Sequence, residues 1–418
     1  MSFNIALTGL NAANEDLSVT SNNLANSATV GFKTSTTEFS SLFASSPTGV
    51  SATAAGNGVA VGEVAQQFTE GDIETTGNSL DMAIDGNGFF IMSDNGALSY
   101  TQDGEFQLNS QNQVVNDQGQ VLQGYPPLSN GTFNTGALQD LTLSTSESAP
   151  LATTAVQLTA NLPADSSAPA DAPFSPTNPD SYTDTTSLSV YDSEGAAHTS
   201  TLYFAATATP GTWDVYEYVD GNAVNATPAT LTYNSSGQLT SATNASGTAA
   251  TGGTVSFGTY TPTGTGAAAM NMTFNFSQVS QYGGSFGVTA VNQNGYTTGQ
   301  LTGISVSQTG VVQAQYTNGN SVNLGQVALA NFANTEGLQQ DGNQTWSATQ
   351  TSGPAVNGVA GGSGFGTIQS GSLEESNVDT TSALVEMITA ERAFQANAQM
   401  IQTEDQVTQS IIQIDQNG

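Results

Sequence analysis

The sequence predicts a mainly β protein with terminal α-helices: two β domains in series, one inserted in the other, and a helical coiled-coil domain formed by both chain termini. Three observations support this prediction. Apolar residues recur every seven positions near each end of the chain. Between the ends, short alternating stretches are separated by Asp-Gly and Asn-Gly pairs, which favour tight hairpins. A Pro/Ala/Ser/Asp-rich segment, 163–181, is typical of a linker or long loop inside the β region.

The N-terminal segment from Phe3 to Asn26 has the periodicity of a helix. Its large apolar residues recur at a spacing of seven: Phe3, Leu10, Leu17 and Leu24. A repeat of seven keeps one apolar seam turned toward a partner helix. The rest of the segment is rich in Asn, Ser, Thr and acidic residues, so a single helix cannot bury this seam by itself.

The C-terminal segment predicts a long helix that starts near Asp379, whose side chain can cap it, and runs to Ile414 without Pro or Gly. At 1.5 Å per residue its length is about 50 Å, too long for burial in a compact domain. A core helix of a globular domain is the ordinary alternative, but the sequence between the two ends supplies no helical partner. We therefore expect an assembly seam between subunits that comprises Phe3, Leu10, Leu17, Leu24, Val385, Ile388, Phe394, Met400, Ile401, Val407, Ile411 and Ile414.

The region between the terminal helices divides into an inner and an outer β domain. Residues 1–70 hold the N-terminal helix and its connecting segment, and 362–418 hold the connector and the C-terminal helix. The inner β domain has two parts, 71–145 and 285–361. The block 146–284 has its own alternating stretches and ends in Gly-rich turns, so we expect it to be an inserted outer β domain.

The charge balance excludes several classes of partner. The chain has 34 acidic residues against 2 Lys and Arg, and its formal net charge is −32. Lys33 and Arg392 are the permanent cations, so the chain repels nucleic acid and anionic membranes. It has no cysteine, no apolar run long enough to span a bilayer, and no basic, apolar signal sequence at its start. We expect no nucleic-acid partner, no membrane insertion and, if the chain is exported, no cleaved signal peptide.

The sequence gives no positive indication of catalysis. His198 is the one histidine, and a catalytic triad or a histidine zinc site needs further partners. We interpret it as a surface or loop residue at the edge of a strand. The stretch 81–88 resembles the start of a calcium loop, but Ala83 occupies a ligand position, and a hairpin turn explains it better. We therefore predict no enzyme activity, no cofactor and no metal.

Long, specific motifs at both ends resemble the flagellar rod and hook protein family. The matching stretches are 22–33 (NNLANSATVGFK), 80–90 (LDMAIDGNGFF), 100–106 (YTQDGEF), 371–379 (GSLEESNVD) and 390–397 (AERAFQAN). Residues 324–334 (LGQVALANFAN), with Gly337, Leu338 and Trp346, are similar to the hook members in particular. The middle block carries no matching motif, and its place rests on its position.

The resemblance implies an extracellular structural subunit of the bacterial flagellum. Such subunits leave the cell unfolded through the flagellar type III apparatus and polymerise as a curved tube, the universal joint that passes torque from rod to filament. The resemblance further implies contacts with further copies of the chain, with rod and hook–filament junction proteins, with a hook cap and with an export chaperone. Two alternatives stay open: a distal rod-type axial protein and a secreted β-rich adhesin. The inserted block favours hook over rod.

Overall fold

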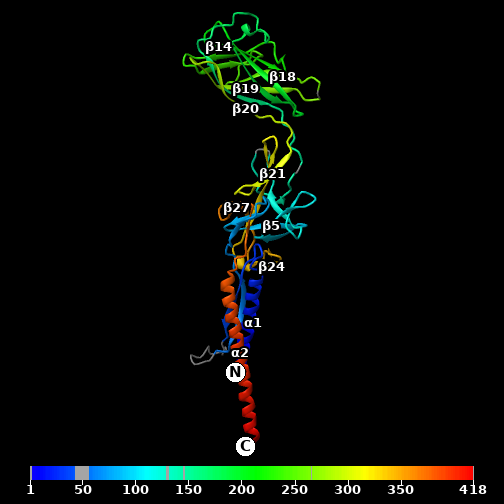
Figure 1. Ribbon diagram of the computed structural model, residues 1–418, viewed down its shortest axis with the longest axis vertical. Helices are drawn as coiled ribbons and strands as arrows, with labels where there is room; N and C mark the ends of the chain where they lie inside the picture. The colour runs from blue at the N-terminus through cyan, green and yellow to red at the C-terminus, as the bar shows by residue number, and fades with distance from the viewer. Residues whose placement is uncertain (1, 43–55, 129–130, 145, 265, 418) are drawn as a thin grey trace. The chain divides into compact units, whose positions relative to one another are not determined.

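The computed structural model describes residues 2–42, 56–128, 131–144, 146–264 and 266–417 (Figure 1). These residues form two compact units. The first consists of 1–145, 303–314 and 321–418, and the second of 146–302 and 315–320. The protein is mainly β with one helix at each end of the chain, as the sequence predicts.

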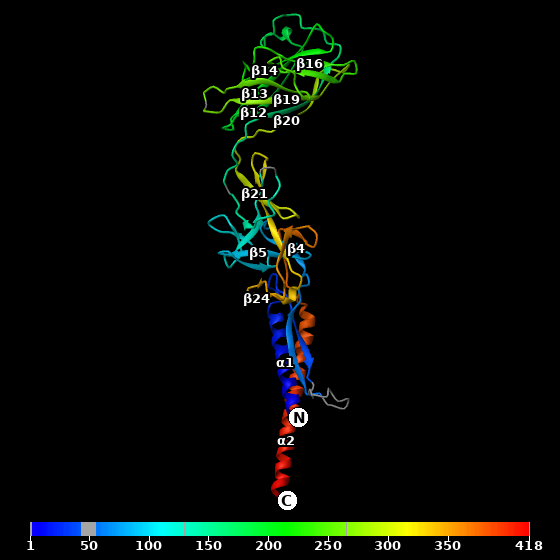
Figure 2. The same cartoon turned by 180° about the vertical axis from the view of Figure 1, so that it is seen from behind.

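The first unit contains both helices, α1 (Ser2–Ala25) and α2 (Thr380–Asn417), which pack side by side in opposite directions (Figures 1 and 2). The carboxylate of Asp379 caps α2, since its Oδ1 accepts hydrogen bonds from the backbone N–H groups of Thr381 and Ser382 at 2.8 and 3.0 Å. With 38 residues against 24, α2 is the longer helix, and its C-terminal stretch runs past the start of α1.

A pair of antiparallel strands, β1 (Ser35–Ser41) and β2 (Val59–Gln66), lies against α1. The side chain of Asn23 fixes the end of α1 to the start of β1. Its Nδ2 donates to the carbonyl of Ser35 at 2.7 Å, and its Oδ1 accepts from the N–H of Ser35 at 3.0 Å. The first unit thus has a helical part that is stiffened by two strands.

The β part of the first unit is a twelve-stranded sheet with two short strand pairs, β27–β4 and β28–β3. Its main path runs β21-β22-β23-β9-β5-β6-β25-β24. The strands and one short 3-10 helix are β3 (Ile73–Thr75), β4 (Met82–Asp85), β5 (Phe89–Asp94), β6 (Ala97–Thr101), β7 (Gln107–Leu108), β8 (Val114–Val115), β9 (Val121–Tyr125), β10 (Gln139–Asp140), β21 (Leu301–Val306), β22 (Val311–Tyr316), β23 (Ser321–Asn331), η2 (Thr335–Gly337), β24 (Gln339–Gly342), β25 (Thr345–Ser347), β26 (Val356–Val359), β27 (Thr367–Ser370) and β28 (Ser372–Glu374).

Turn chemistry and apolar burial explain this sheet. Asn95 and Gly96, between β5 and β6, have φ angles of 50° and 95°, which is the reason for an Asn-Gly pair in a tight hairpin. The apolar run that begins β5 is buried on both faces of the sheet: Phe90 packs in one hydrophobic cluster and Phe89 in another with Trp346. Burial on both faces makes β5 a central strand.

The second unit is a pair of sheets around one core. A six-stranded sheet runs β12-β13-β14-β16-β17 with β15 beside β14, and a four-stranded sheet runs β18-β19-β11-β20. Large side chains from both sheets, among them Phe204, Trp213 and Phe274, form one buried cluster between them. The elements are β11 (Ala155–Pro163), η1 (Pro179–Ser181), β12 (Asp184–Tyr191), β13 (Ala197–Ala206), β14 (Thr212–Val219), β15 (Asn222–Ala223), β16 (Ala229–Tyr233), β17 (Leu239–Thr243), β18 (Thr254–Tyr260), β19 (Met270–Tyr282) and β20 (Gly287–Gln293).

One expected boundary needs correction. The sequence placed the end of the outer block at 284 and the return of the inner β domain at 285. In the structure, the segment 315–320 of that expected domain belongs to the second unit, and so does all of 285–302. The reason is that β20 pairs antiparallel with β11, from Val156 opposite Gln293 to Asn161 opposite Gly287, and completes the four-stranded sheet. The Gly283-Gly284 turn therefore connects two strands of one sheet.

Candidate assembly surface

Small residues form the buried faces of the two helices. The buried alanines are Ala6, Ala12 and Ala13 on α1 and Ala383 and Ala390 on α2. Gly9 faces Asn397 so closely that an added Cβ would lie 2.8 Å from the Oδ1 of Asn397. Small side chains allow two helix backbones to approach closely. The contact between α1 and α2 inside the chain therefore depends on small residues and leaves most of the large ones for other contacts.

Many of the large apolar side chains of the helical part are exposed to solvent. Val385 and Ile388 are 60% and 50% exposed. The other exposed members are Phe3 and Leu7 on α1, Leu384, Met400, Val407, Ile411 and Ile412 on α2, and Phe39, Leu42, Val61 and Val64 on or beside the β1–β2 pair. An exposed apolar surface of this extent marks an interaction site. We call it the apolar helix surface.

The structure separates the predicted seam residues into three groups. Those exposed on the apolar helix surface are Phe3, Val385, Ile388, Met400, Val407 and Ile411. Those half-buried are Leu10, Leu17, Leu24, Phe394 and Ile401. Ile414 belongs to α2, but its side chain lies outside the described residues. Their role between subunits stays a prediction, and the structure adds that the first group is free for a partner without any rearrangement of the helix pair.

Lengthening a buried alanine tests the small-residue contact. We expect Ala390→Leu to destabilise the packing of α1 on α2 by about 1–3 kcal/mol, because extra methyl groups in a close contact force the helices apart. Ala393→Leu is the matched control, since Ala393 is exposed on the same helix. Hydrogen exchange of the α1 and α2 amides measures the effect. Equal protection in the two variants would contradict this description of the contact.

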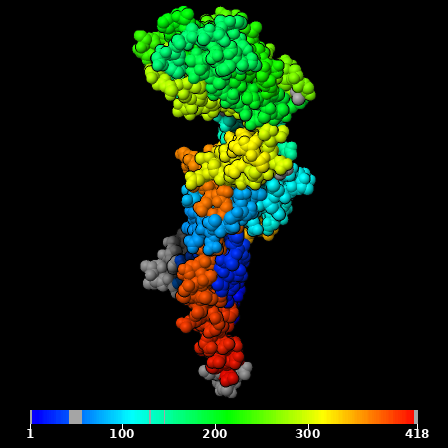
Figure 3. All heavy atoms as spheres, turned by 45° about the horizontal axis from the view of Figure 1, so that its top comes forward, coloured from blue at the N-terminus to red at the C-terminus, as the bar shows by residue number. Residues whose placement is uncertain are grey.

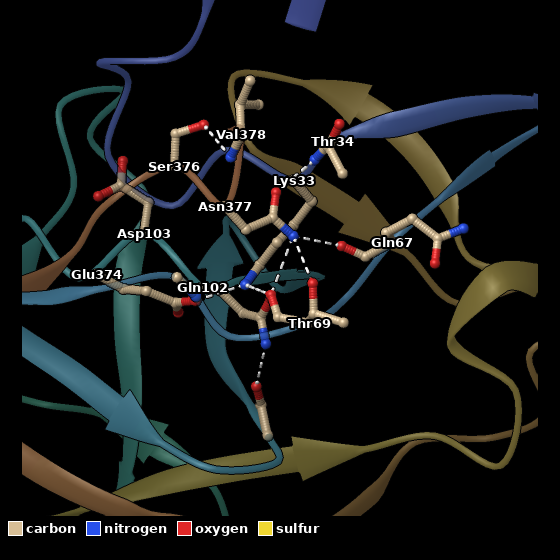
Figure 4. A network of polar contacts seen from close by, with 12 residues as sticks. Lys33, Thr34, Gln67, Thr69, Gln102, Asp103, Glu374, Ser376, Asn377 and Val378 are labelled. Atoms are coloured by element: carbon tan, nitrogen blue, oxygen red, sulfur yellow. Dashed lines mark hydrogen bonds and ion pairs between the residues drawn. The ribbon is translucent and has the colours of Figure 1, made fainter. Parts of the chain in front are cut away.

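The helical and β parts of the first unit meet at a buried ion pair (Figure 4). The Nζ of Lys33 lies 2.6 Å from the Oε1 of Glu374, and the two side chains are 1% and 2% exposed. Lys33 also donates to the carbonyl of Thr69 at 3.0 Å, and the N–H of Gly71 donates to the same Glu374 oxygen at 2.8 Å. The pair therefore joins the segment after α1, the segment after β2 and the segment before α2. We call this group the Lys33 junction.

The side chain of Asn377 connects the same three segments. Its Oδ1 accepts from the N–H of Thr34 at 2.7 Å, and its Nδ2 donates to the carbonyl of Gln67 at 2.8 Å. Gly31 shares the site: its φ is +66°, and an added Cβ would lie 2.8 Å from the backbone N of Asp103. Burial raises the pKa of the Asp103 carboxyl to about 6. The geometry explains why glycine stands at position 31.

His198 has more partners than the sequence indicates. It lies on β13, and its ring nitrogens Nδ1 and Nε2 lie 2.6 and 3.2 Å from the carboxylates of Asp220 and Asp192. Burial lowers the pKa of His198, but the hydrogen bonds and charges of the two aspartates outweigh this effect and raise it above 6.5. With both ring nitrogens occupied, the half-buried His198 links the two aspartates within the second unit and has no free nitrogen for general-base catalysis.

The acidic turn that resembles a calcium loop is explained by local hydrogen bonds. Asp81 is buried, and its carboxylate accepts from the Thr76 hydroxyl at 2.6 Å and from the Asn78 amide at 2.8 Å. Within the described residues, no group of three or more His, Cys, Asp or Glu side chains is arranged to hold a metal ion. Asp81 organises its own loop. The expectation of a hairpin turn at 81–88 was wrong, because β4 pairs with β27 whereas β5 pairs with β6 and β9.

Glu217 is a buried acid in the core of the second unit. It is 2% exposed, accepts a hydrogen bond from the Ser200 hydroxyl at 3.0 Å, and burial raises its pKa to about 7. The ordinary pKa of the unfolded state is 4.5, so its favourable contribution to folding is complete below pH 4.5 and is lost as the pH rises through 7.

We expect Glu217→Gln to reduce this pH dependence. Above pH 8 the buried carboxylate costs the wild type about 3 kcal/mol, which glutamine avoids. Urea unfolding at pH 5 and pH 8.5 measures the free energy of unfolding of the second unit. Trp213 fluorescence reports the unfolding in a Trp346→Phe background, in which Trp213 is the remaining tryptophan. Glu194→Gln, an exposed position in the same unit, is the control and should follow the wild type. The same pH profile in wild type and Glu217→Gln would contradict the prediction.

Comparisons with known proteins cover nearly the whole chain. Four family profiles match in sequence order: "Flagella basal body rod protein" at 3–33, "Flagellar hook protein FlgE/F/G D1 domain" at 83–165, "Flagellar basal body protein FlaE D2 domain" at 161–296 and "Flagellar basal body rod FlgEFG protein C-terminal" at 369–414. The last profile includes most of α2, and the third lies within the second unit.

Full-length relatives match both ends and the middle. The flagellar hook proteins FlgE of Salmonella typhimurium and Escherichia coli K12 are each 39% identical to this chain, across 99% of it and 100% of theirs. The hook protein of Rhizobium meliloti is 30% identical across 98% and 97%. A crystal structure of Helicobacter pylori flagellar hook protein FlgE2 has the same fold over 71% of this chain and 99% of its own, with a TM-score of 0.51 and 13% identity.

Proposed function

The chain belongs to the flagellar hook protein family, and from this premise we propose that it polymerises through its apolar helix surface into the curved tube that passes torque from rod to filament. The apolar helix surface is the observation that carries the proposal. Its large side chains are exposed in the isolated chain although the two helices already pack on each other. Burying each of them is worth about 1.5–3 kcal/mol, so their removal from water drives association.

The Lys33 junction supports the mechanical part of the proposal. A torque that enters at the helices must reach the β part of the first unit without bending the segments between them. Lys33 and Glu374 tie those segments together through charge-assisted hydrogen bonds at a buried ion pair, and the neutral, partly buried hydrogen bonds of Asn377 add to them. We propose that this junction keeps the helical and β parts of the first unit in one fixed arrangement under load.

The two units have different roles in the proposed tube. The first unit, which carries the helices, forms the tube, and the second unit makes contacts between neighbouring copies that adjust curvature. The ends of the insertion lie side by side, because the N–H of Ser148 donates to the carbonyl of Gly299 at 2.8 Å. An insertion with adjacent ends leaves its host domain intact.

The proposal also includes the route of export and the binding partners of the chain. We propose that the chain leaves the cell unfolded through the flagellar type III apparatus without loss of an N-terminal signal, and that it meets the rod, the hook–filament junction proteins, the hook cap and an export chaperone. In the described part of the chain, no helix is long and apolar enough to cross a membrane. The proposed role is structural, without catalysis or a cofactor.

Electron microscopy of the concentrated, purified chain tests the proposed function. We expect curved tubes, because the apolar helix surface remains open in each isolated copy. Straight tubes would favour a rod-type axial protein. Copies that stay monomeric at high concentration and bind glycans would contradict polymerisation and favour a secreted adhesin.

A further inference from the structure

Arg392 is the cation that the fold leaves open to solvent. The chain has two permanent cations, and Lys33 is buried against Glu374. Arg392 is exposed on α2, and no carboxylate of the described residues lies within ion-pair distance of its guanidinium. In a chain of net charge −32, one exposed guanidinium is a distinctive feature of the surface that carries it.

Arg392 sits within the apolar helix surface. Val385, Ile388 and Arg392 follow one another at spacings of three and four along α2. Residues at these spacings share one face of a helix. Val385 and Ile388 are the two most exposed apolar residues in the first turns of α2. A partner that covers them therefore also removes Arg392 from water. A guanidinium removed from water needs a carboxylate partner.

A second stripe, farther along α2, has the complementary charge. Met400, Glu404, Val407 and Ile411 follow one another at spacings of four, three and four, so Glu404 interrupts an apolar stripe as Arg392 does. The C-terminal end of α2 runs past the start of α1 (Figures 2 and 3). Met400, Val407 and Ile411 are exposed.

The two stripes cannot meet within one chain. Arg392 and Glu404 are twelve positions apart on a continuous helix, which is about 18 Å along its axis. No ion pair of Glu404 is formed with the residues that the structure describes. The partner of each stripe must therefore come from another molecule.

We propose that Arg392 of one copy pairs with Glu404 of a second copy, with the two α2 helices parallel and Ile388 packed opposite Met400. The proposal rests on the proposed function, since it names the contact by which copies polymerise. The contact joins two different surfaces of the same chain, so each added copy leaves one stripe of each kind open. Such head-to-tail contacts build open helical polymers, whereas a self-complementary surface closes into a dimer.

The ion pair fixes register more than it adds affinity. Apolar stripes alone can slide by one helical turn, because Ile, Val and Met side chains fit one another in several registers. A slide of one turn would place Arg392 against an apolar side chain and leave both charges without a partner. Asp405, next to Glu404, points about 100° away around the helix and cannot replace it.

Charge reversal tests the pairing in the full-length chain. We expect Arg392→Glu and Glu404→Arg each to raise the critical concentration for tube formation about tenfold or more, because each reversal puts like charges together at every contact. The double variant should return to within about threefold of the wild type. Arg392→Glu with Asp405→Arg has the same net charge and should stay defective. Sedimentation and electron microscopy measure assembly, and circular dichroism checks folding.

The outcomes separate the pairing from the proposed function. If the wild type forms tubes and the Arg392→Glu variant assembles equally well, the pairing is wrong while the proposed function stands. Equal rescue by Arg at 404 and at 405 would do the same, because it would show a general charge effect. A wild-type chain that forms no tubes would overturn both. The chain has no cysteine, so Arg392→Cys with Glu404→Cys provides a second readout: oxidised tubes should give a ladder of covalent oligomers.

Discussion

Replacing Val385 and Ile388 together by aspartate abolishes tube formation in our account and leaves the monomer folded. Both side chains are at least half exposed in the isolated chain, so the change alters monomer stability by no more than about 0.5 kcal/mol. In the proposed tube the same positions are buried, so we expect the loss of two large apolar groups to remove about 3–6 kcal/mol from each contact. Light scattering and electron microscopy of the purified variant measure the result.

Two controls separate apolar burial from added charge. Val385→Leu with Ile388→Leu keeps an apolar surface and should still assemble. Asn14→Asp with Ser18→Asp adds the same two charges at exposed polar positions of α1 and should assemble at a modestly higher concentration. Loss of assembly in this last variant to the same extent would show that repulsion, and not the apolar surface, limits polymerisation.

Replacing Lys33 by methionine destabilises the first unit by about 3–5 kcal/mol, the usual cost of removing one partner of a buried ion pair. The carboxylate of Glu374, 2% exposed, is then left without its counter-charge. Unfolding of the first unit is followed by Trp346 fluorescence in a Trp213→Phe background. The second unit should unfold as in the wild type.

A compensating variant and a matched control define the cause. Lys33→Met with Glu374→Gln removes both charges and keeps an acceptor for the Gly71 N–H, so most of the stability should return. Arg392→Met removes the other cation, which is exposed, and should change monomer stability by no more than about 0.5 kcal/mol. If the double variant is as unstable as Lys33→Met alone, the buried charge is not the cause.

Local signals were sufficient for the helices and for some turns, and insufficient for others and for one boundary. The cap at Asp379, the long helix after it and the Asn95-Gly96 hairpin depend on neighbouring residues, and the sequence shows them directly. The strand before Asp85-Gly86 instead pairs with β27, almost three hundred residues later in the chain. The boundary at 284 was wrong because a Gly-Gly turn looks the same inside a sheet as between domains. Only the pairing of β20 with β11, more than a hundred residues earlier in the chain, distinguishes the two.

The sequence indicated the apolar stripes of the two helices but not the arrangement of their side chains, and the role of the seam between subunits remains a prediction. A repeat of seven identifies a contact stripe, yet it does not say that alanines serve the contact inside the chain and larger residues face outward. The partners of Lys33 and His198 were not predictable, since Glu374 is 341 positions from Lys33 and the aspartates around His198 lie on separate turns. A signal for the Lys33 junction was present: a lone lysine in an acidic chain, two positions after a glycine.

A helical reconstruction of assembled tubes by electron cryo-microscopy shows which surfaces hold the copies together. We expect the terminal helices of neighbouring copies to contact one another, with Val385 and Ile388 buried between copies and the contact of α1 with α2 preserved within each copy. Tubes in which copies touch only through their β sheets, with Val385 and Ile388 still facing solvent, would contradict this expectation.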